Sequence, residues 1–198
     1  MINLSYSSGS ALPYWTDPLT YAVERAWRAG IVVVVAAGND GTGQLRIGVP
    51  ANDPLVLAVG GVEAVDGGTF VIPSWATNGN GLRNPDVAAP GAHIDSLRAP
   101  WSRIDAEHPE GRQADERLFR GSGSSQAAAV TSGAVALLLD ANPALTPDQV
   151  KDALRNSADA TVLPKFSSFF AGKGVVRVDR AVTVPLTAKV QSSTPSSG

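Results

Sequence analysis

The sequence has no cysteine and only two histidines, and these shortages restrict the chemistry that it can carry. Without cysteine there are no disulfides, no thiolate metal sites and no cysteine nucleophile. The two histidines, His93 and His108, are too few for a site built from several imidazoles. Histidine-dependent catalysis must therefore use one of these two residues or a residue from outside the chain.

An excess of charge of one sign and long apolar runs are also missing. The 16 Lys+Arg against 18 Asp+Glu give a formal net charge of −2, which argues against nucleic acid or an anionic membrane as a partner. The longest apolar run, Ile31 to Ala37, is far shorter than the roughly 18 residues of a membrane span. The first five residues lack the basic region and apolar stretch of a signal peptide. We therefore expect the chain to begin within folded structure.

The remaining composition fits one domain with an ordinary core. Hydrophobic residues make up 43% of the 198 residues, which is enough for a buried interior. The 20 glycines and 14 prolines exceed the average share and indicate many specified turns.

Residues 17–29 have the pattern of an amphipathic helix. Asp17 can accept the free N–H groups of the first turn, Pro18 suits the first helical position, and Gly30 suits the position after the end. The apolar residues of this stretch share one face: Leu19, Ala22, Val23, Ala26 and Trp27. We expect Glu24, Arg25 and Arg28 on the opposite face.

Apolar runs at 31–35, 54–62 and 86–89 predict three strands. The first, Ile31-Val32-Val33-Val34-Val35, has no alternation, which is typical of a strand buried on both faces of a parallel sheet. Residues 125–140 predict a helix that is apolar nearly all round and therefore central. A capping box at Thr146-Pro147-Asp148-Gln149 begins another helix that ends near residue 157. This order predicts an α/β fold with a mostly parallel sheet.

Two segments differ from the rest of the chain. Residues 98–120 carry a dense mixture of both charges and include His108, so we expect a long surface loop. Residues 185–198 end in Gln-Ser-Ser-Thr-Pro-Ser-Ser-Gly and have the composition of a linker or a frayed tail.

The first candidate motif is Gly38-Asn39-Asp40-Gly41, directly after the valine-rich strand. The carboxyl end of a buried strand is where open α/β sheets place their ligand sites. The amide of Asn39 could donate to an oxyanion there, or the motif could simply be a turn. A dinucleotide site is excluded, because the third glycine of its motif would fall on Arg46.

The second candidate is Gly121-Ser122-Gly123-Ser124-Ser125, which leads into the apolar helix. A serine at this place usually caps the helix. The same position also puts a hydroxyl beside free N–H groups that can stabilise an anion during acyl transfer. A phosphate cradle is a further reading, but no Walker lysine follows.

Taken together, the motifs resemble the C-terminal portion of the catalytic domain of subtilisin-like serine peptidases, the subtilase or S8 family. Asn3-Leu4-Ser5, VVVVAAGND, PDVAAPG and GSGSSQAAAVTSG occur in the family's order, and the resemblance extends from Ile2 to Ala181. It implies a three-layer α/β fold. It also implies that Ser125 is the nucleophile and that Asn39 and the Ser125 N–H form the oxyanion hole.

The resemblance further implies where a polypeptide substrate binds. Ser5, Tyr6 and Ser7 match the edge strand that pairs with the substrate backbone, and Ala37 and Gly38 match the opposite wall of the S1 pocket. Val49-Pro50 matches the family's cis-proline turn. The chain departs from the family at Ser7-Ser8, where glycines are usual, and at Ser124 and Gln126, where Thr and Met are usual. The 98–120 segment is longer than expected and lies just before the nucleophile, so it could overhang the site.

The catalytic base is missing from the expected place. The family order is Asp, His, Ser, yet no histidine precedes Asn39, and we assign Asp17 to a helix cap. We expect both His93 and His108 to be surface residues. We therefore expect residues 1–184 to be part of a larger peptidase domain whose missing N-terminal portion carries the triad Asp and His. The chain alone would then be inactive.

The remaining expectations concern an alternative function, cofactors and metals, and secretion. The alternative function is a degenerate subtilisin-like module that binds peptides or takes part in assembly. We expect no cofactor and assign no metal site. Secretion is implied by the family resemblance.

Overall fold

The predicted α/β architecture is confirmed in the computed structural model, which describes residues 1–185 and 191. A parallel sheet has the strand order β1-β2-β3-β5. The strands are β1 (Ile2–Leu4), β2 (Val33–Ala36), β3 (Leu57–Val65) and β5 (Val87–Pro90). A short strand, β4 (Thr69–Val71), runs antiparallel to the end of β3. The sheet of the described residues is thus mostly parallel.

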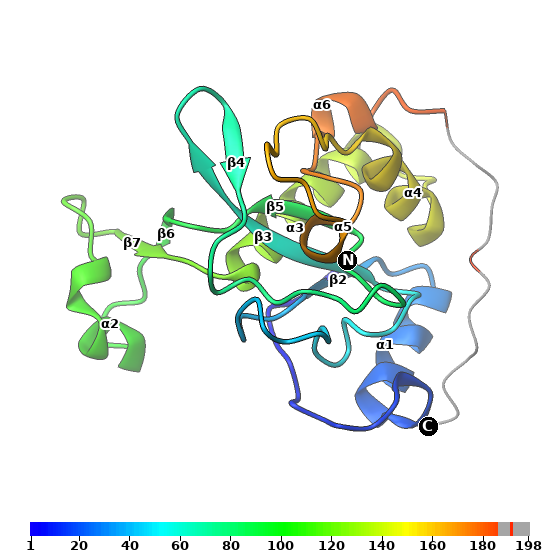
Figure 1. Cartoon of the computed structure of the whole chain (residues 1–198), viewed down its shortest axis with the longest axis horizontal. Helices are drawn as coiled ribbons and strands as arrows, with labels where there is room; N and C mark the ends of the chain where they lie inside the picture. Colours follow the sequence, from blue (N-terminus) through cyan, green and yellow to red (C-terminus); the bar gives the residue numbers. More distant parts are fainter. Residues whose placement is uncertain (186–190, 192–198) are drawn as a thin grey trace.

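Helices cover both faces of this sheet. The long ones are α1 (Pro18–Arg28), α3 (Ser124–Ala141) and α4 (Pro147–Ser157), and two short ones follow, α5 (Ser168–Ala171) and α6 (Val178–Ala181). In Figure 1, α1 lies on one side of the sheet, and α3 and α4 lie on the other. Val33, Val34 and Val35 are completely buried, as a strand covered on both faces requires.

Helix α1 has the predicted ends but a different buried face. The Oδ1 of Asp17 accepts hydrogen bonds from the N–H groups of Leu19 and Thr20 at 2.9 and 3.1 Å. The expectation that Glu24 faces solvent with Arg25 and Arg28 is wrong, because Glu24 is only 3% exposed. The reason is that this side of the helix packs against a second buried carboxyl group.

That second group is Asp53, whose side chain is fully buried. Its Oδ1 accepts a hydrogen bond from Leu55 N at 2.7 Å. The pKa of Asp53 is raised to about 7, most of all by burial; the hydrogen bond from Leu55 opposes this shift and the neighbouring charge of Glu24 adds to it. The fold therefore favours the protonated form of Asp53, which can share its proton with Glu24.

A cluster of charges at the start of β5 joins α4 to the sheet. Asp86 forms ion pairs with Arg83 at 3.1 Å and Lys151 at 3.3 Å. Lys151, only 1% exposed, also donates to the carbonyl oxygens of Pro54, Leu55 and Val56. Burial lowers the pKa of Lys151 to about 8, although Asp86 opposes this shift. The hydrogen bonds satisfy all three hydrogens of the buried ammonium group.

Helix α3 is less enclosed than its composition suggests. Its inner face packs across β1, β2, β3 and β5, but Val130 is 40% exposed and Leu137 is 57% exposed. The expectation that this helix is enclosed on all sides is therefore wrong: its outer face is not covered by residues 1–185 and 191. Strand β1, which α3 also contacts, pairs only with β2 in the described sheet.

The expected surface loop at 98–120 is instead a folded extension, which we call the arm (residues 94–121). Strands β6 (Ile94–Leu97) and β7 (Leu118–Gly121) pair antiparallel, and α2 (Arg103–Glu107) and a 3₁₀ turn (Pro109–Gly111) lie between them. The arm projects from the body of the molecule in Figure 1.

Asp105 explains why the arm is folded although its sequence is polar. This carboxylate is 3% exposed and accepts hydrogen bonds from Arg98 Nε at 2.6 Å and Arg112 Nε at 2.9 Å. These bonds, that from Arg98 most of all, hold the pKa of Asp105 well below its usual range. The density of charged residues indicates a solvated loop, but it does not show which of these residues form ion pairs with one another.

Two further expectations concern the ends of elements and membranes. The predicted linker at 185–198 lies outside the described residues, apart from positions 185 and 191. None of the helices in the described part of the chain is long and apolar enough to cross a membrane.

Asp53→Asn should stabilise the chain more at pH 8 than at pH 5. The folded pKa of Asp53 lies above its unfolded value, so its contribution is fully present below about pH 4 and is lost as the pH rises through about 7. Asparagine retains the acceptor for Leu55 N and removes this loss. The gain at pH 8 should reach a few kcal/mol, since each pKa unit corresponds to about 1.4 kcal/mol. Urea unfolding at both pH values measures it.

The matched control is Asp66→Asn, an exposed carboxylate in the β3–β4 turn. It should leave the pH dependence unchanged. A gain for Asp53→Asn that is equal at both pH values would contradict the buried, protonated carboxyl group.

Candidate active site

The site begins where α3 starts. Gly123 precedes the helix with a φ of +151°, and its N–H donates to Gly91 O at 2.7 Å. A Cβ at this position would lie 3.0 Å from both Asn39 Nδ2 and Gln126 Oε1. Glycine is therefore required both by the backbone conformation and by the closeness of these amides.

Two hydrogen bonds join this helix start to the end of β2. Ser124 N donates to Asn39 Oδ1 at 2.7 Å, and Gly38 N donates to Ser124 Oγ at 3.1 Å. Ser124 is only 1% exposed. Because Oδ1 of Asn39 is the acceptor, its Nδ2 is left as a donor at the exposed side of the turn.

A second contact, with Thr77, fixes the same turn. The N–H of Asp40 donates to Thr77 Oγ1 at 2.8 Å. Gly38 has a φ of +122°, and a Cβ there would lie 2.9 Å from that same oxygen. Sequence reasoning missed Thr77, since nothing in the sequence relates it to a turn 37 residues away. The turn reading and the oxyanion reading of Asn39 are compatible, because the turn is what presents the amide.

Ser125 is the second residue of α3 and is half-buried. Its carbonyl oxygen accepts a hydrogen bond from Ser5 Oγ at 3.0 Å. Across residues 1–185 and 191, no side chain hydrogen-bonds to its hydroxyl. The hydroxyl thus lies beside the first turn of a long helix, where the backbone N–H groups and the helix dipole favour negative charge.

The predicted substrate-binding segments are brought to one place. Residues 5–7 continue from β1 and are exposed, with Tyr6 58% exposed. Ala37 and Gly38 continue from β2. Both segments bond to the same stretch, since Gly48 N donates to Ala37 O at 3.1 Å and Ser8 N donates to Val49 O at 3.0 Å. The Val49–Pro50 peptide bond is cis, as the resemblance implied.

The two histidines remain apart from Ser125. The His93 side chain is 68% exposed, and its Nε2 lies 3.5 Å from Glu63. His108 is 54% exposed and its Nδ1 lies 2.9 Å from Glu110 Oε1. Both are surface residues as predicted. The described structure thus assembles a hydroxyl, a side-chain amide and a helix start, but it supplies no imidazole to the hydroxyl.

Comparisons with known proteins agree with this arrangement. The sequence model of the subtilase family matches residues 1–179. The serine protease AprX of Bacillus subtilis is 41% identical over 160 residues, which cover 76% of this chain and 36% of that protein. Subtilisin of Bacillus pumilus is 33% identical over 183 residues, which cover 91% of this chain and 56% of that protein. The chain therefore spans about a third to a little over half of these relatives.

Solved structures give the same result for the fold. Fervidolysin from Fervidobacterium pennivorans, described as a keratinolytic enzyme related to subtilisin, has a TM-score of 0.68 at 28% identity. The match covers 85% of this chain and 25% of that one. The prenylagaramide maturation protease PagA has a TM-score of 0.68 at 26% identity, with coverage of 92% and 60%.

Ser124→Ala should destabilise the chain by about 1–3 kcal/mol, because the part-buried N–H of Gly38 loses its acceptor. Ser124→Thr keeps the hydroxyl and should retain most of the stability. Urea unfolding of the three proteins measures the difference. Equal losses for alanine and threonine would show that packing, and not the hydrogen bond to Gly38, is what matters at this position.

Proposed function

The chain belongs to the subtilase family, and from this premise we propose that it is the nucleophile-bearing part of a serine endopeptidase. In this proposal residues 1–184 form a portion of the catalytic domain. The observation that carries it is the position of Ser125 at the start of α3, next to the amide of Asn39 that Ser124 orients. The substrate is a polypeptide, and the reaction is hydrolysis of a peptide bond.

Ser125 is the proposed nucleophile. A base removes the proton of its hydroxyl, and Oγ attacks the carbonyl carbon of the substrate. The carbonyl oxygen becomes an oxyanion, which accepts hydrogen bonds from Asn39 Nδ2 and from the N–H of Ser125. The positive end of α3 adds to this stabilisation. The intermediate collapses as the protonated base gives its proton to the leaving nitrogen and the C–N bond breaks. The amine departs, and water then removes the acyl group left on Ser125.

The edge segment and the opposite wall hold the substrate in this proposal. Ser5, Tyr6 and Ser7 pair with the substrate backbone as an added strand. Ala37 and Gly38 form the other wall of the pocket for the residue before the scissile bond. The hydrogen bond from Ser5 Oγ to Ser125 O supports this reading, because it fixes the edge segment relative to the nucleophile.

The base and its orienting carboxylate are proposed to come from polypeptide outside residues 1–198. Ser125 has no imidazole partner in the described structure, and the open β1 edge beside the apolar outer face of α3 offers a surface for such polypeptide. An unpaired strand edge can pair with a further strand, so the proposal places a strand of that polypeptide on β1 and an apolar element over Val130 and Leu137. Family resemblance alone supports an extracellular location.

Fluorophosphonate labelling of the complete protein that contains this chain tests the proposal. Ser125→Ala should abolish labelling, whereas Ser168→Ala, at an exposed serine in the pocket that also contains Asp86 and Arg155, should not. Asn39→Asp keeps the acceptor for Ser124 N but removes the donor. It should slow labelling by about 10²–10³-fold with little change in thermal stability.

Equal labelling of the Ser125→Ala variant would exclude Ser125 as the nucleophile. It would favour the alternative of a subtilisin-like module that binds peptides without cleaving them. The isolated chain should label far more slowly than the complete protein, since loss of the base in subtilisin lowers kcat by about 10⁶-fold.

A further inference from the structure

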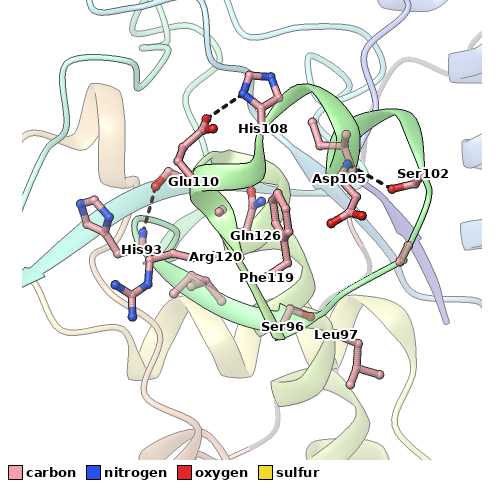
Figure 2. A pocket seen from close by; sticks show the side chains of 16 residues that line it. His93, Ser96, Leu97, Ser102, Asp105, His108, Glu110, Phe119, Arg120 and Gln126 are labelled. Carbon is pink, nitrogen blue, oxygen red and sulfur yellow. Dashed lines mark hydrogen bonds and ion pairs between the residues drawn. The ribbon is translucent and has the colours of Figure 1, made fainter. Parts of the chain in front are cut away.

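A cavity of about 610 Å³ lies between the arm and the start of α3. Figure 2 shows its lining, with Gln126 at its inner end and the arm residues around it. Ser122 and Gln126, which line it, lie on either side of Ser125 in the sequence. Residues 5–7 and 37–38, the proposed walls for the acyl part of the substrate, do not line this cavity. The space is therefore open to a different part of a substrate.

The arm carries large apolar side chains in solvent. Leu97 is 84% exposed, Trp101 is 95% exposed and Ile104 is 54% exposed. Leu97 and Ile104 line the cavity, and Trp101 lies between two further lining residues, Ala99 and Ser102. Apolar side chains gathered on a small projection are typical of an interaction site, and tryptophan contributes strongly to such sites.

The backbone holds Trp101 in this exposed position at a cost. Its φ is +61°, a conformation that bulky L-residues rarely adopt. Its N–H donates to Asp105 Oδ2 at 3.2 Å, so the same carboxylate that binds Arg98 and Arg112 also fixes this turn. The other non-glycine residue with positive φ among the described residues is His93, which also lines the cavity. Such strain is concentrated at functional sites.

The charges around the cavity do not favour a charged ligand. His93 pairs with Glu63, His108 with Glu110, and Arg120 with Asp95 at 2.8 Å. Asp105 is paired with Arg98 and Arg112. These pairs leave the exposed apolar side chains of the arm as the groups that the cavity offers to a ligand.

We propose that the arm binds an apolar side chain on the leaving-group side of the peptide bond that Ser125 attacks. Leu97, Trp101 and Ile104 provide the apolar contacts, and the lining residue Gln126 directly follows the nucleophile in the sequence. The proposal rests on the role of Ser125 given above. It adds a substrate preference that depends on the arm.

Peptide binding to the full 198-residue chain tests this directly and does not require cleavage. Two fluorescein-labelled decapeptides are compared by fluorescence anisotropy; they are alike except for two Phe or two Ser among their last five residues. The Phe peptide should bind about tenfold more tightly than the Ser peptide. The double variant Leu97→Ser/Trp101→Ser should lose this difference, and its melting temperature should not fall, because both side chains are exposed.

Leu82→Ser is the matched control, because Leu82 is 95% exposed but lies away from the arm. It should leave the Phe preference unchanged. Trp101→Gly removes the ring while allowing the positive φ, so it should weaken the Phe peptide without lowering the melting temperature. Equal binding of the two peptides by the unmodified chain, or an equal loss with Leu82→Ser, would overturn the proposal.

Ser125→Ala separates this proposal from the proposed function. It should bind both peptides as the unmodified chain does, since the preference depends on the arm and not on the hydroxyl. Labelling of Ser125 in the complete protein together with a failure of the Phe preference would reject the arm alone. Phe-dependent binding without any labelling of Ser125 would reject the nucleophile and show a peptide-binding arm.

Discussion

The site depends on two hydrogen bonds that join the end of β2 to the start of α3. Ser124 N binds Asn39 Oδ1, and Gly38 N binds Ser124 Oγ. These partners are 85 and 86 residues apart in sequence, and only a parallel sheet covered by α3 places them at the same edge. Their effect is to set the orientation of one amide: with Oδ1 occupied, Asn39 can present only its NH₂ group to an incoming oxygen. The hydroxyl of Ser125 then lies one residue further along the same helix. The fold itself thus positions the proposed donor and the proposed nucleophile.

A cluster of charged side chains stabilises the amino end of β5. Asp86 is buried at the start of β5 and is surrounded by Arg83, Lys151 and Arg155. Removing a carboxylate from water is costly, but here the cations and the N–H of Ala58 satisfy it. Lys151 also binds three successive carbonyl oxygens, those of residues 54–56, so α4 is fixed to the segment directly before β3.

The sequence predicted well whatever depends on short-range pattern. The buried valine strand, the cap at Asp17 and the capping box at Thr146 are all present, because each depends on residues within a few positions of one another. The order of motifs also predicted the family and the segments that the fold brings to Ser125.

The predictions that failed concern contacts between charged groups or helix faces that lie far apart in the sequence. Glu24 was expected in solvent, since an amphipathic pattern does not reveal that Asp53 is buried opposite it. The arm was expected to be a loop, since no pattern shows that Asp105 collects Arg98 and Arg112. The apolar composition of α3 predicts that its outer face is covered. Composition alone does not show whether the described residues include an element that covers it. Each of these features depends on contacts between residues far apart in the chain, and a local sequence pattern does not show such contacts.

In the proposed function, this chain presents Ser125 as the nucleophile and Asn39 as the oxyanion donor, and it lacks only a base. Chemical rescue with imidazole tests it most directly, by measuring fluorophosphonate labelling of Ser125 in the isolated, folded chain with and without added imidazole. Imidazole should accelerate labelling of the unmodified chain, have no effect on Ser125→Ala, and have a much smaller effect on Asn39→Asp. Labelling of the folded chain that is unchanged by imidazole would contradict the proposed function.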